Sequence, residues 1–287
     1  MTFNGLDREK WLVAGMAGVL LLVLFLGGRR TPGQKPPAAR QADSSHTHEG
    51  FDIAAYLDTS LARLDNPQGD RARAMTLALS RARADEMRQD ILDDLADFWR
   101  DSARNTLAYL WYNGEGAKLE NSEKSLTFAA HAYLFELRGE TDPGLKSWMA
   151  LQARSLYKSA LAINPKNDSA TVGYGSTYFF VTAEGGTPME GILKIREVAE
   201  RDSTNLFAQF MLGYGGLVSG QYDRAADRFE RVLKREPGNK EAVFLMAEAC
   251  ERSGNREKAL YWYRVGRNQV DNPDVIRAID EKIASLQ

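Results

Sequence analysis

The chain contains few of the residues that most often perform chemistry, with one cysteine and three histidines among its 287 residues. A single cysteine excludes a disulfide within the chain and leaves the redox compartment open. His46 and His48 flank a threonine, with no nearby cysteine or paired carboxylates, and make a poor ligand set for a metal. We therefore expect no metal site and no cofactor.

Candidates for catalysis are equally scarce. Cys250 falls in the middle of a predicted helix, away from the cationic or helix N-terminal setting that activates a thiol. The glycine-rich segments at Gly173 and Gly213 lie inside predicted helices and lack the lysine of a phosphate-binding nucleotide loop. We expect these glycines to allow close contact between helices instead. We expect neither an enzyme nor a small-molecule substrate. That expectation would change if His131 and an acid converged in a pocket.

Charge of either sign is not in excess, because 37 basic and 39 acidic residues leave a net charge of −2. Recognition of nucleic acid depends on neutralising phosphates with a surplus of lysine and arginine. The composition gives no general reason to expect a nucleic acid partner.

A repeat with a stride of 34 residues is the strongest pattern that is present: Gly220, Ala225 and Phe229 recur as Gly254, Ala259 and Tyr263. Moving upstream by the same stride reaches Gly186 and Gly191, a weaker third unit. A fourth unit, slightly out of stride, ends in an aromatic residue, a small residue and a proline. A period of this length is typical of helical hairpins that stack into a solenoid.

The unit from Leu206 to Asn239 resembles the tetratricopeptide repeat (TPR) family through Leu212-Gly213, Ala225-x3-Phe229 and Pro237. It departs from the family pattern at Gln209 and Gly216, where the family has tryptophan and tyrosine. The resemblance covers roughly residues 122–271. It implies an all-α, TPR-type helical-hairpin solenoid, wound as a right-handed superhelix, which grips another protein or peptide.

The predicted signature positions share a packing role, because small residues let paired helices approach and aromatic residues fill the gap to the next repeat. They are Tyr157, Ala160, Pro165, Leu212, Gly213, Gly220, Ala225, Phe229, Pro237, Gly254, Ala259 and Tyr263.

Further helices are predicted on both sides of the repeats. Residues 51–121 contain apolar residues at helical spacing and are expected to form several helices, the last of which begins a degenerate first repeat. Thr187-Pro188-Met189-Glu190 has the form of a capping box, and Asn272-Pro273 marks the start of a C-terminal capping helix within 272–287.

The N-terminal part of the chain predicts a membrane anchor. After a short tail of residues 1–10, residues 11–28 contain no charged side chain. A helix of this length rises about 1.5 Å per residue and just spans a hydrocarbon core of about 30 Å. A cleaved secretory signal is the alternative interpretation, although the small-residue cleavage pattern is missing after the apolar run. Residues 29–50 are rich in proline and small polar residues and are expected to form a flexible tether.

The orientation of this single-pass anchor is left open by its flanking charges. Arg29, Arg30, Lys35 and Arg40 follow the apolar run, and a count of positive charges alone would keep the repeats in the cytoplasm. The signal-like N-terminus instead favours an extracytoplasmic, periplasmic domain of a bacterial-type envelope protein, and this is the side that we expect.

The inner face of the superhelix is the predicted partner-binding groove. Its expected lining is aromatic in the middle and acidic toward the C-terminal end: Phe180, Phe207, Phe210, Tyr214, Leu217, Phe244, Glu248 and Glu251. Such a lining suits an apolar or amphipathic segment. Two alternatives stay open, namely that these aromatic residues belong to the core, or that the chain's own N-terminal helices cover them.

Two functions follow from the sequence. The first is a membrane-tethered TPR scaffold that captures a protein partner and keeps it near the bilayer. The second is a structural subunit of a cell-envelope assembly, with self-association among its contacts.

Overall fold

Helix starts in this chain are set by capping side chains. In the computed structural model, which describes residues 51–181 and 187–287, Asn205 accepts a hydrogen bond from the backbone of Ala208, and Asn239 accepts one from Ala242. Each bond satisfies a backbone N–H that the first helical turn leaves without a partner. The predicted capping box is confirmed, since Thr187 and Glu190 cap each other's backbone N–H at the start of a helix. Asn272 and Pro273 begin the last helix as expected.

The described residues form helices and contain no strand. In chain order they are α2 (Ile53–Ala62), α3 (Asn66–Arg81), α4 (Asp85–Asp97), the π-helical turn η1 (Phe98–Ser102), α5 (Thr106–Glu120), α6 (Glu123–Leu137), α7 (Pro143–Ile163), α8 (Asp168–Thr177), α9 (Pro188–Arg201), α10 (Leu206–Val218), α11 (Tyr222–Arg235), α12 (Lys240–Arg252), α13 (Arg256–Arg267) and α14 (Pro273–Ser285).

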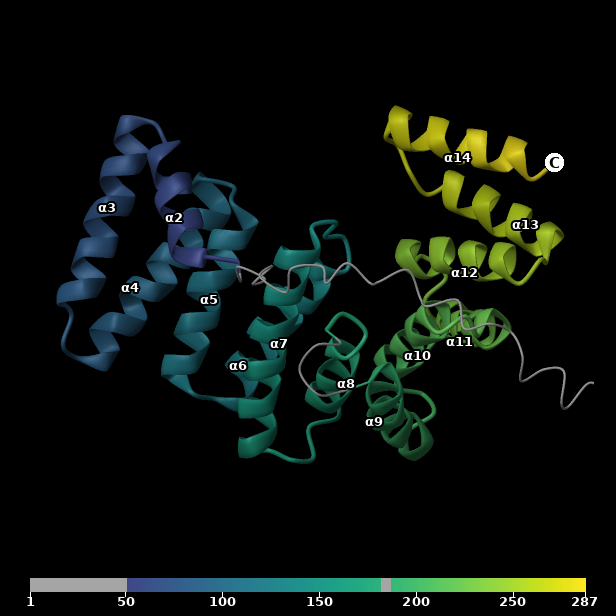
Figure 1. Ribbon diagram of the computed structural model, residues 1–287, viewed down its shortest axis with the longest axis horizontal. Coiled ribbons are helices and arrows are strands. Elements are labelled where there is room, and N and C mark those ends of the chain that lie inside the picture. Colours follow the sequence, from purple (N-terminus) through teal and green to yellow (C-terminus); the bar gives the residue numbers. More distant parts are fainter. Residues whose placement is uncertain (1–50, 182–186) are drawn as a thin grey trace, which may run out of the picture. The chain divides into compact units, whose positions relative to one another are not determined.

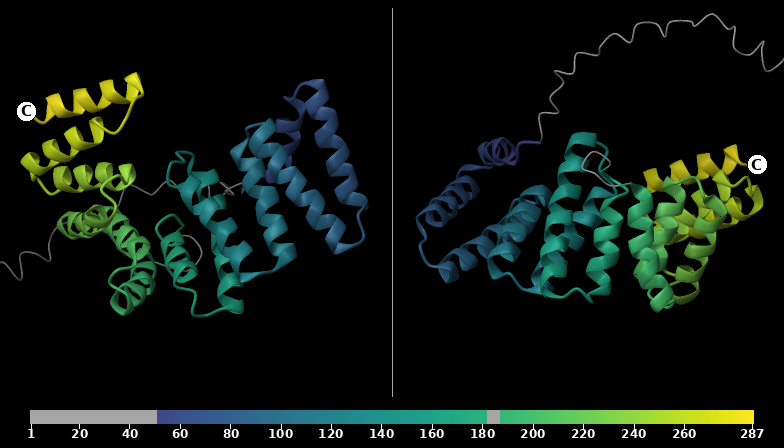
Figure 2. Two further views of the ribbon diagram at one scale, coloured as in Figure 1. Left: turned by 180° about the vertical axis from the view of Figure 1, so that it is seen from behind. Right: turned by 60° about the horizontal axis from the view of Figure 1, so that its bottom comes forward.

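Consecutive helices pack against each other as hairpins within residues 50–287. The pairs α6/α7, α8/α9, α10/α11 and α12/α13 fall in the stretch where the sequence predicts repeats, and Figures 1 and 2 show them following one another in chain order. Because α6 contacts α8, α8 contacts α10 and α10 contacts α12, the first helices of successive hairpins lie next to each other. The prediction of an all-α array of helical hairpins is confirmed for the described residues.

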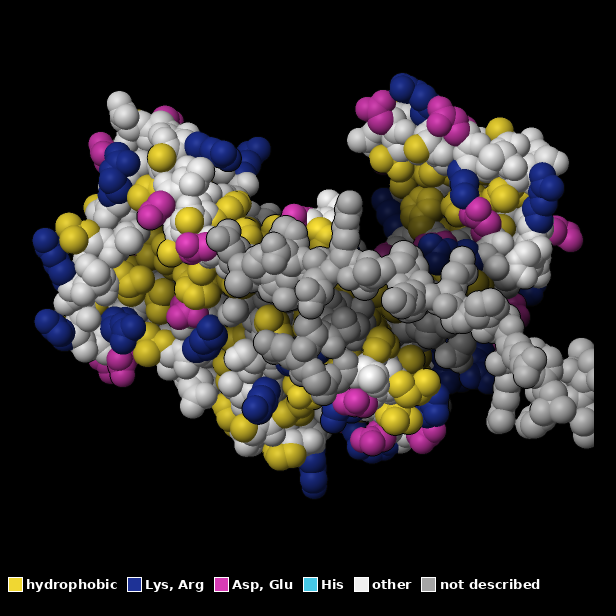
Figure 3. All heavy atoms as spheres, viewed as in Figure 1, with side chains coloured by type: hydrophobic (Ala, Val, Ile, Leu, Met, Phe, Trp, Pro, Cys, Tyr) yellow, Lys and Arg dark blue, Asp and Glu magenta, His cyan; other side chains and the backbone are white. Residues whose placement is uncertain are grey.

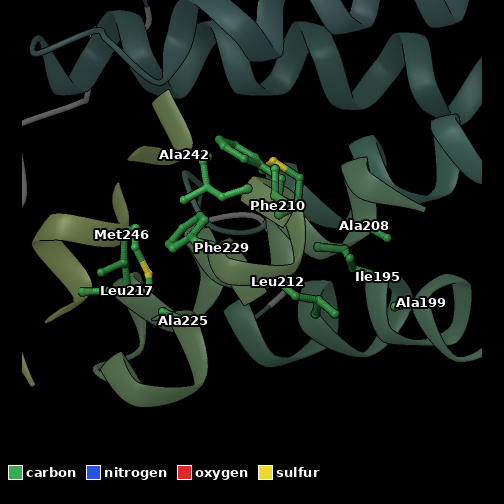
Figure 4. Close-up of a cluster of buried hydrophobic side chains, with 14 of the residues drawn as sticks. Ile195, Ala199, Ala208, Phe210, Leu212, Leu217, Ala225, Phe229, Ala242 and Met246 are labelled. Carbon is green, nitrogen blue, oxygen red and sulfur yellow. The ribbon is translucent and has the colours of Figure 1, made fainter. Parts of the chain in front are cut away.

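Small residues at the signature positions have the packing role that the sequence predicts. A Cβ atom added to Gly213 of α10 would lie 2.8 Å from Cε1 of Phe229 in α11, and one added to Gly216 would lie 3.1 Å from the Cβ of Ala225. The ring of Phe229 is fully buried and meets Phe210 edge to face, with 5.8 Å between ring centroids (Figure 4). Close approach of α10 and α11 therefore depends on the absence of side chains at these glycines.

Gly220 and Gly254 have a second role that the repeat pattern alone does not show. Their φ angles are +75° and +81°, in the left-handed region that side chains with a Cβ rarely adopt. Each glycine follows the first helix of its hairpin and turns the chain into the second. Pro165 and Pro237 each lie two residues beyond the end of α7 and α11, where a proline stops helix continuation.

The helices before the repeats agree with their predicted extents in most places. Residues 70–101 form more than one helix, as expected, and the predicted helix near residues 107–119 is α5. The segment after Leu64 breaks the chain direction, but it also starts α3, because Asp65 accepts a hydrogen bond from the backbone of Gln68. Pro67 then occupies the first turn, where it needs no hydrogen-bonding N–H.

The predicted anchor at residues 11–28, the tether at 29–50 and its histidines, and Gly186 lie outside the described residues. Among residues 51–181 and 187–287, no helix is both long enough and apolar enough to cross a bilayer.

Candidate functional site

Two adjoining pockets separate the C-terminal half of α6 from α10 and α12. The larger has a volume of about 600 Å³ and the smaller about 350 Å³. Phe135, Arg138 and Glu241 line both pockets, so we treat them as one groove, called the α6 groove below. Most of its remaining lining comes from α10 and α12, which belong to successive hairpins.

An ion pair between Arg138 and Glu241 divides the groove. The guanidinium of Arg138, at the end of α6, donates two hydrogen bonds of 3.0 Å to the carboxylate of Glu241, in the first turn of α12. The two charges lie at helix ends of opposite polarity, which favours a cation at the first and an anion at the second. Arg138 also lies over the rings of Phe135 and Phe210, at 5.2 and 5.6 Å from the ring centroids. Its side chain is only 12% exposed, so this bridge is a fixed part of the groove.

Exposed aromatic residues on α6 form the other notable feature. Phe128 and Phe135 are seven residues apart on one helix, and their exposed fractions are 61% and 63%. Phe135 lines the groove, whereas Phe128 lines neither pocket. A heptad spacing places both residues on one helix face. The sequence contains this seven-residue spacing. The groove was instead predicted by applying the 34-residue stride to α8, α10 and α12, which leaves α6 out.

Several of the predicted groove residues do line the α6 groove. Tyr214, Leu217 and Glu248 line the larger pocket, and Phe207 and Phe210 line the smaller one. Phe180 lines neither pocket but packs on Tyr214, with 5.5 Å between ring centroids.

Two of these residues also belong to the core. Phe210 and Leu217 are each only 7% exposed and form part of the buried cluster around α10 to α12. The interpretation that some of the aromatic residues are core therefore applies to Phe210. The helices within residues 51–121 contribute no lining residue to either pocket, so in the described structure they leave the α6 groove uncovered.

Phe244 and Glu251 lie outside the lining of both pockets, which differs from the prediction. The ring of Phe244 packs against Gly266 of α13, where an added Cβ would lie 2.6 Å from Cε1 of Phe244. The carboxylate of Glu251 accepts hydrogen bonds from Lys282 of α14 at 2.5 Å and from Tyr263 at 2.8 Å. Burial raises the pKa of Glu251, but these two donors outweigh it and hold the pKa below its usual range. The prediction used a fixed stride, which assigns the same inward face to every first helix. In the structure, α13 covers Phe244 and α14 contacts Glu251, so these two side chains do not face the groove.

His131 is held as a structural residue. Its Nδ1 hydrogen-bonds the hydroxyl of Tyr157 at 2.7 Å, and its Nε2 hydrogen-bonds the hydroxyl of Ser169 at 2.8 Å. Burial, helped by the positive charge of Arg138, lowers the pKa of His131 to about 4. Both ring nitrogens are engaged by hydroxyl groups. Glu236 and Glu241 line the same smaller pocket as His131, but in the described structure neither carboxylate hydrogen-bonds the imidazole.

Cys250 is buried, and burial raises the pKa of its thiol, which opposes thiolate formation. Within residues 51–181 and 187–287, no cluster of three or more histidine, cysteine and acidic side chains is placed to hold a metal ion. Gly173 and Gly213 lie inside α8 and α10, where their lack of a side chain accommodates the rings of Tyr157 and Phe229.

Comparison with known proteins agrees with the hairpin packing. Residues 217–279, from the end of α10 into α14, match the family model for the tetratricopeptide repeat. These residues contain tetratricopeptide repeats. No protein in the curated set matches the sequence.

Solved structures show the same fold at low sequence identity. A tetratricopeptide repeat protein from Parabacteroides merdae is 15% identical with a TM-score of 0.52, and the match covers 80% of this chain and 84% of that one. PilW, a widely conserved type IV pilus biogenesis factor, is 20% identical with a TM-score of 0.50, and the match covers 69% of this chain and 85% of PilW. At these identities the likeness concerns the fold alone.

In this TPR-like array, α6, α8, α10 and α12 are the first helices of successive hairpins, and α7, α9, α11 and α13 are the second helices. The α6 groove is thus lined mainly by first helices, which is the face that the resemblance predicted for binding.

Proposed function

We propose that this TPR protein is a scaffold that holds a segment of a partner protein in the α6 groove. The observation that carries the proposal is Phe135, a phenylalanine with 63% of its surface exposed at a pocket of about 600 Å³. Exposed aromatic residues around a concave site are typical of protein interaction surfaces, where they supply most of the binding free energy.

The lining indicates an amphipathic occupant. Phe135, Tyr214, Leu217, Val218 and Leu245 give the larger pocket an apolar surface, and Val218 is 49% exposed. A volume of this size accommodates a few side chains of a segment that lies along the groove, as in helix-in-groove recognition.

Charged side chains at the groove edges would orient such a segment. Glu248 is paired with Arg252 at 2.7 Å, and Arg138 is paired with Glu241. Glu136 also lines the larger pocket and has no cationic group within 4.0 Å among the described residues. A segment with apolar residues on one face and a basic residue at its edge would complement this surface.

The proposal includes a membrane tether, which rests on the sequence. Residues 11–28 would anchor the chain in a bilayer, residues 29–50 would act as a spacer, and the repeats would lie on the extracytoplasmic side of a bacterial envelope. Tethering would raise the concentration of a captured partner at the membrane without any additional contact.

Affinity capture with groove variants tests the scaffold function. The full-length chain would be compared with Phe135→Ser and with Val218→Ser, because both side chains are exposed and their loss leaves the core unchanged. Leu77→Ser is the matched control, since Leu77 of α3 is 49% exposed and lies far along the chain from the groove.

We expect one or more proteins that the unmodified chain and Leu77→Ser recover equally and that both groove variants lose. Recovery of the same proteins by all four chains would contradict the assignment of the groove. If the only molecule lost is a second copy of the chain, shown by a mass that depends on concentration, the structural, self-associating function is the correct one.

The tether is tested separately by membrane fractionation. We expect the full-length chain to stay in the membrane pellet after an alkaline carbonate wash, and a chain without residues 11–28 to appear in the supernatant. A mature N-terminus that begins after residue 28 would show that the segment is a cleaved signal and would remove the anchor from the proposal.

A further inference from the structure

A second pocket, away from the α6 groove, gathers arginine side chains. It has a volume of about 310 Å³ and is lined by residues of α9, α10 and α11 together with Gln221. Four arginines from two helices line it: Arg196 of α9, and Arg224, Arg228 and Arg231 of α11. It shares no lining residue with either pocket of the α6 groove.

The side chain of Arg228 is held in place by the buried side-chain amide of Gln209. Its guanidinium donates a hydrogen bond of 2.7 Å to Oε1 of Gln209, a side chain that is 1% exposed. The amide nitrogen of Gln209 in turn donates to the backbone carbonyl of Ser203 at 3.1 Å. This chain of bonds fixes the side-chain amide and therefore fixes Arg228. Gln209 occupies the position where the TPR pattern has tryptophan, so the departure from the family signature supports an arginine.

The charges in this pocket are poorly balanced. Asp227 is the one acidic residue in the lining, against four arginines. Among residues 51–181 and 187–287, no carboxylate oxygen lies within 4.0 Å of a guanidinium nitrogen of these four arginines. Elsewhere in the same structure Arg138, Arg201, Arg252 and Arg267 each have such a partner.

The environment of Arg228 disfavours its charged form. Burial lowers the pKa of its guanidinium, and the positive charges of Arg231 and Arg196 lower it further, while Asp227 and Glu200 act in the opposite direction. A bound anion would relieve the repulsion between these guanidinium groups. On the face shown in Figure 3, basic and acidic side chains both occur.

We propose that the arginine pocket binds the phosphate group of an organic phosphate monoester. Guanidinium groups match phosphate oxygens with paired, parallel hydrogen bonds, and a dianion neutralises more of this cluster than a single carboxylate does. Ile192, Leu212 and Met189 add an apolar wall that suits the organic part of the ligand. The volume accommodates a phosphate with a small substituent.

The proposal is tested by titration calorimetry on the full-length chain with four probes: phenyl phosphate, inorganic phosphate, benzoate and dihexanoyl phosphatidic acid below its micelle concentration. We expect saturable binding of phenyl phosphate, weaker binding of inorganic phosphate because the apolar wall is unused, and weaker binding of benzoate because it carries one charge. The phosphatidic acid distinguishes the source of the phosphate. Tighter binding than phenyl phosphate indicates a lipid headgroup, and weaker binding indicates a soluble ligand.

Variants identify the site. Arg228→Gln removes the fixed guanidinium and should weaken phenyl phosphate binding by about tenfold or more, the effect of losing a charge-assisted hydrogen bond. Arg196→Gln, at an exposed position that cannot disturb folding, should weaken binding in the same direction. Arg235→Gln is the control, because Arg235 lies on α11 but outside the pocket lining. It should leave the affinity for phenyl phosphate within about twofold of the unmodified chain, since salt screens a surface charge at this distance.

Absence of saturable phenyl phosphate binding at millimolar concentration would overturn the proposal. So would unchanged affinity in both Arg196→Gln and Arg228→Gln, or an equal loss in Arg235→Gln, which would show nonspecific attraction to the basic side chains of α11.

Discussion

Replacement of Gly213 by alanine tests the packing argument for the repeat most directly. Gly213 lies inside α10, and its Cα faces the buried ring of Phe229 in α11. The new Cβ would lie 2.8, 2.9 and 3.0 Å from three atoms of that ring. The three contacts belong to one rigid group that is fully buried, so the ring cannot rotate away without displacing its own neighbours.

Two effects of opposite sign decide the result. Alanine in a helix interior is more favourable than glycine by about 0.5–1 kcal/mol. Overpacking of a filled core costs about 1–3 kcal/mol. We therefore expect Gly213→Ala to reduce the free energy of unfolding by about 0.5–2 kcal/mol. Gly238→Ala is the matched control, because no atom lies within 4 Å of its added Cβ. It should be neutral or raise stability by about 0.4–1 kcal/mol, since alanine restricts the unfolded chain.

Urea unfolding of residues 51–287, followed by circular dichroism, measures these differences. A loss of about 1 kcal/mol shifts the midpoint by about 0.3–1 M at the slopes usual for small proteins. Repeating the substitution in a Phe229→Leu background removes the ring, and the added cost of Gly213→Ala should then disappear. A Gly213→Ala variant as stable as the unmodified protein, or a cost that persists without the ring, would refute the reasoning.

Three further outcomes are expected in the same unfolding assay. In a double-mutant cycle with Arg138→Met and Glu241→Gln, the two changes should couple by about 1 kcal/mol, as expected for a partly buried, doubly hydrogen-bonded pair, and additive effects would show that the bridge contributes nothing. The pKa of His131 is lowered to about 4 in the folded protein from an ordinary value of 6.5. Between these two pH values the unfolded chain therefore binds one more proton than the folded chain. The contribution of His131 to stability is full above pH 6.5 and falls as the pH drops toward 4. The loss is at most about 3 kcal/mol, and His131→Gln should flatten this part of the curve, whereas parallel curves for the two proteins would contradict the assignment. Thr187→Ala should cost about 1 kcal/mol by removing the capping box of α9, and a change below about 0.3 kcal/mol would mean that the cap is dispensable.

Local features of the sequence were sufficient to predict the helical framework. The positive φ angles of Gly220 and Gly254 and the cap at Thr187 each involve only a few neighbouring residues, so they depend little on the tertiary setting. Capping side chains bond the first helical turn, and glycine permits a positive φ, whichever helices lie nearby. Signals of this kind also predicted that Gly213 and Ala225 face a neighbouring helix.

The groove could be predicted only in part. Tyr214, Leu217 and Glu248 were found from helix periodicity, since one face of α10 and of α12 is turned inward. Phe244 and Glu251 are at equivalent positions by stride, yet they contact α13 and α14 because a later helix layer covers that part of α12. Periodicity gives the direction of a side chain about its helix axis, and it contains no information on what lies opposite.

The sequence by itself determined where the helices begin and end and which residues let paired helices approach, because those properties depend on residues within one or two turns. Only the tertiary structure decided that Arg138 meets Glu241, which is 103 positions further along the chain, and that arginines of α9 and α11 converge beside Gln209. Contacts of this kind depend on the rotation between successive hairpins, which accumulates from many small packing contacts and is not written in any single segment of the chain.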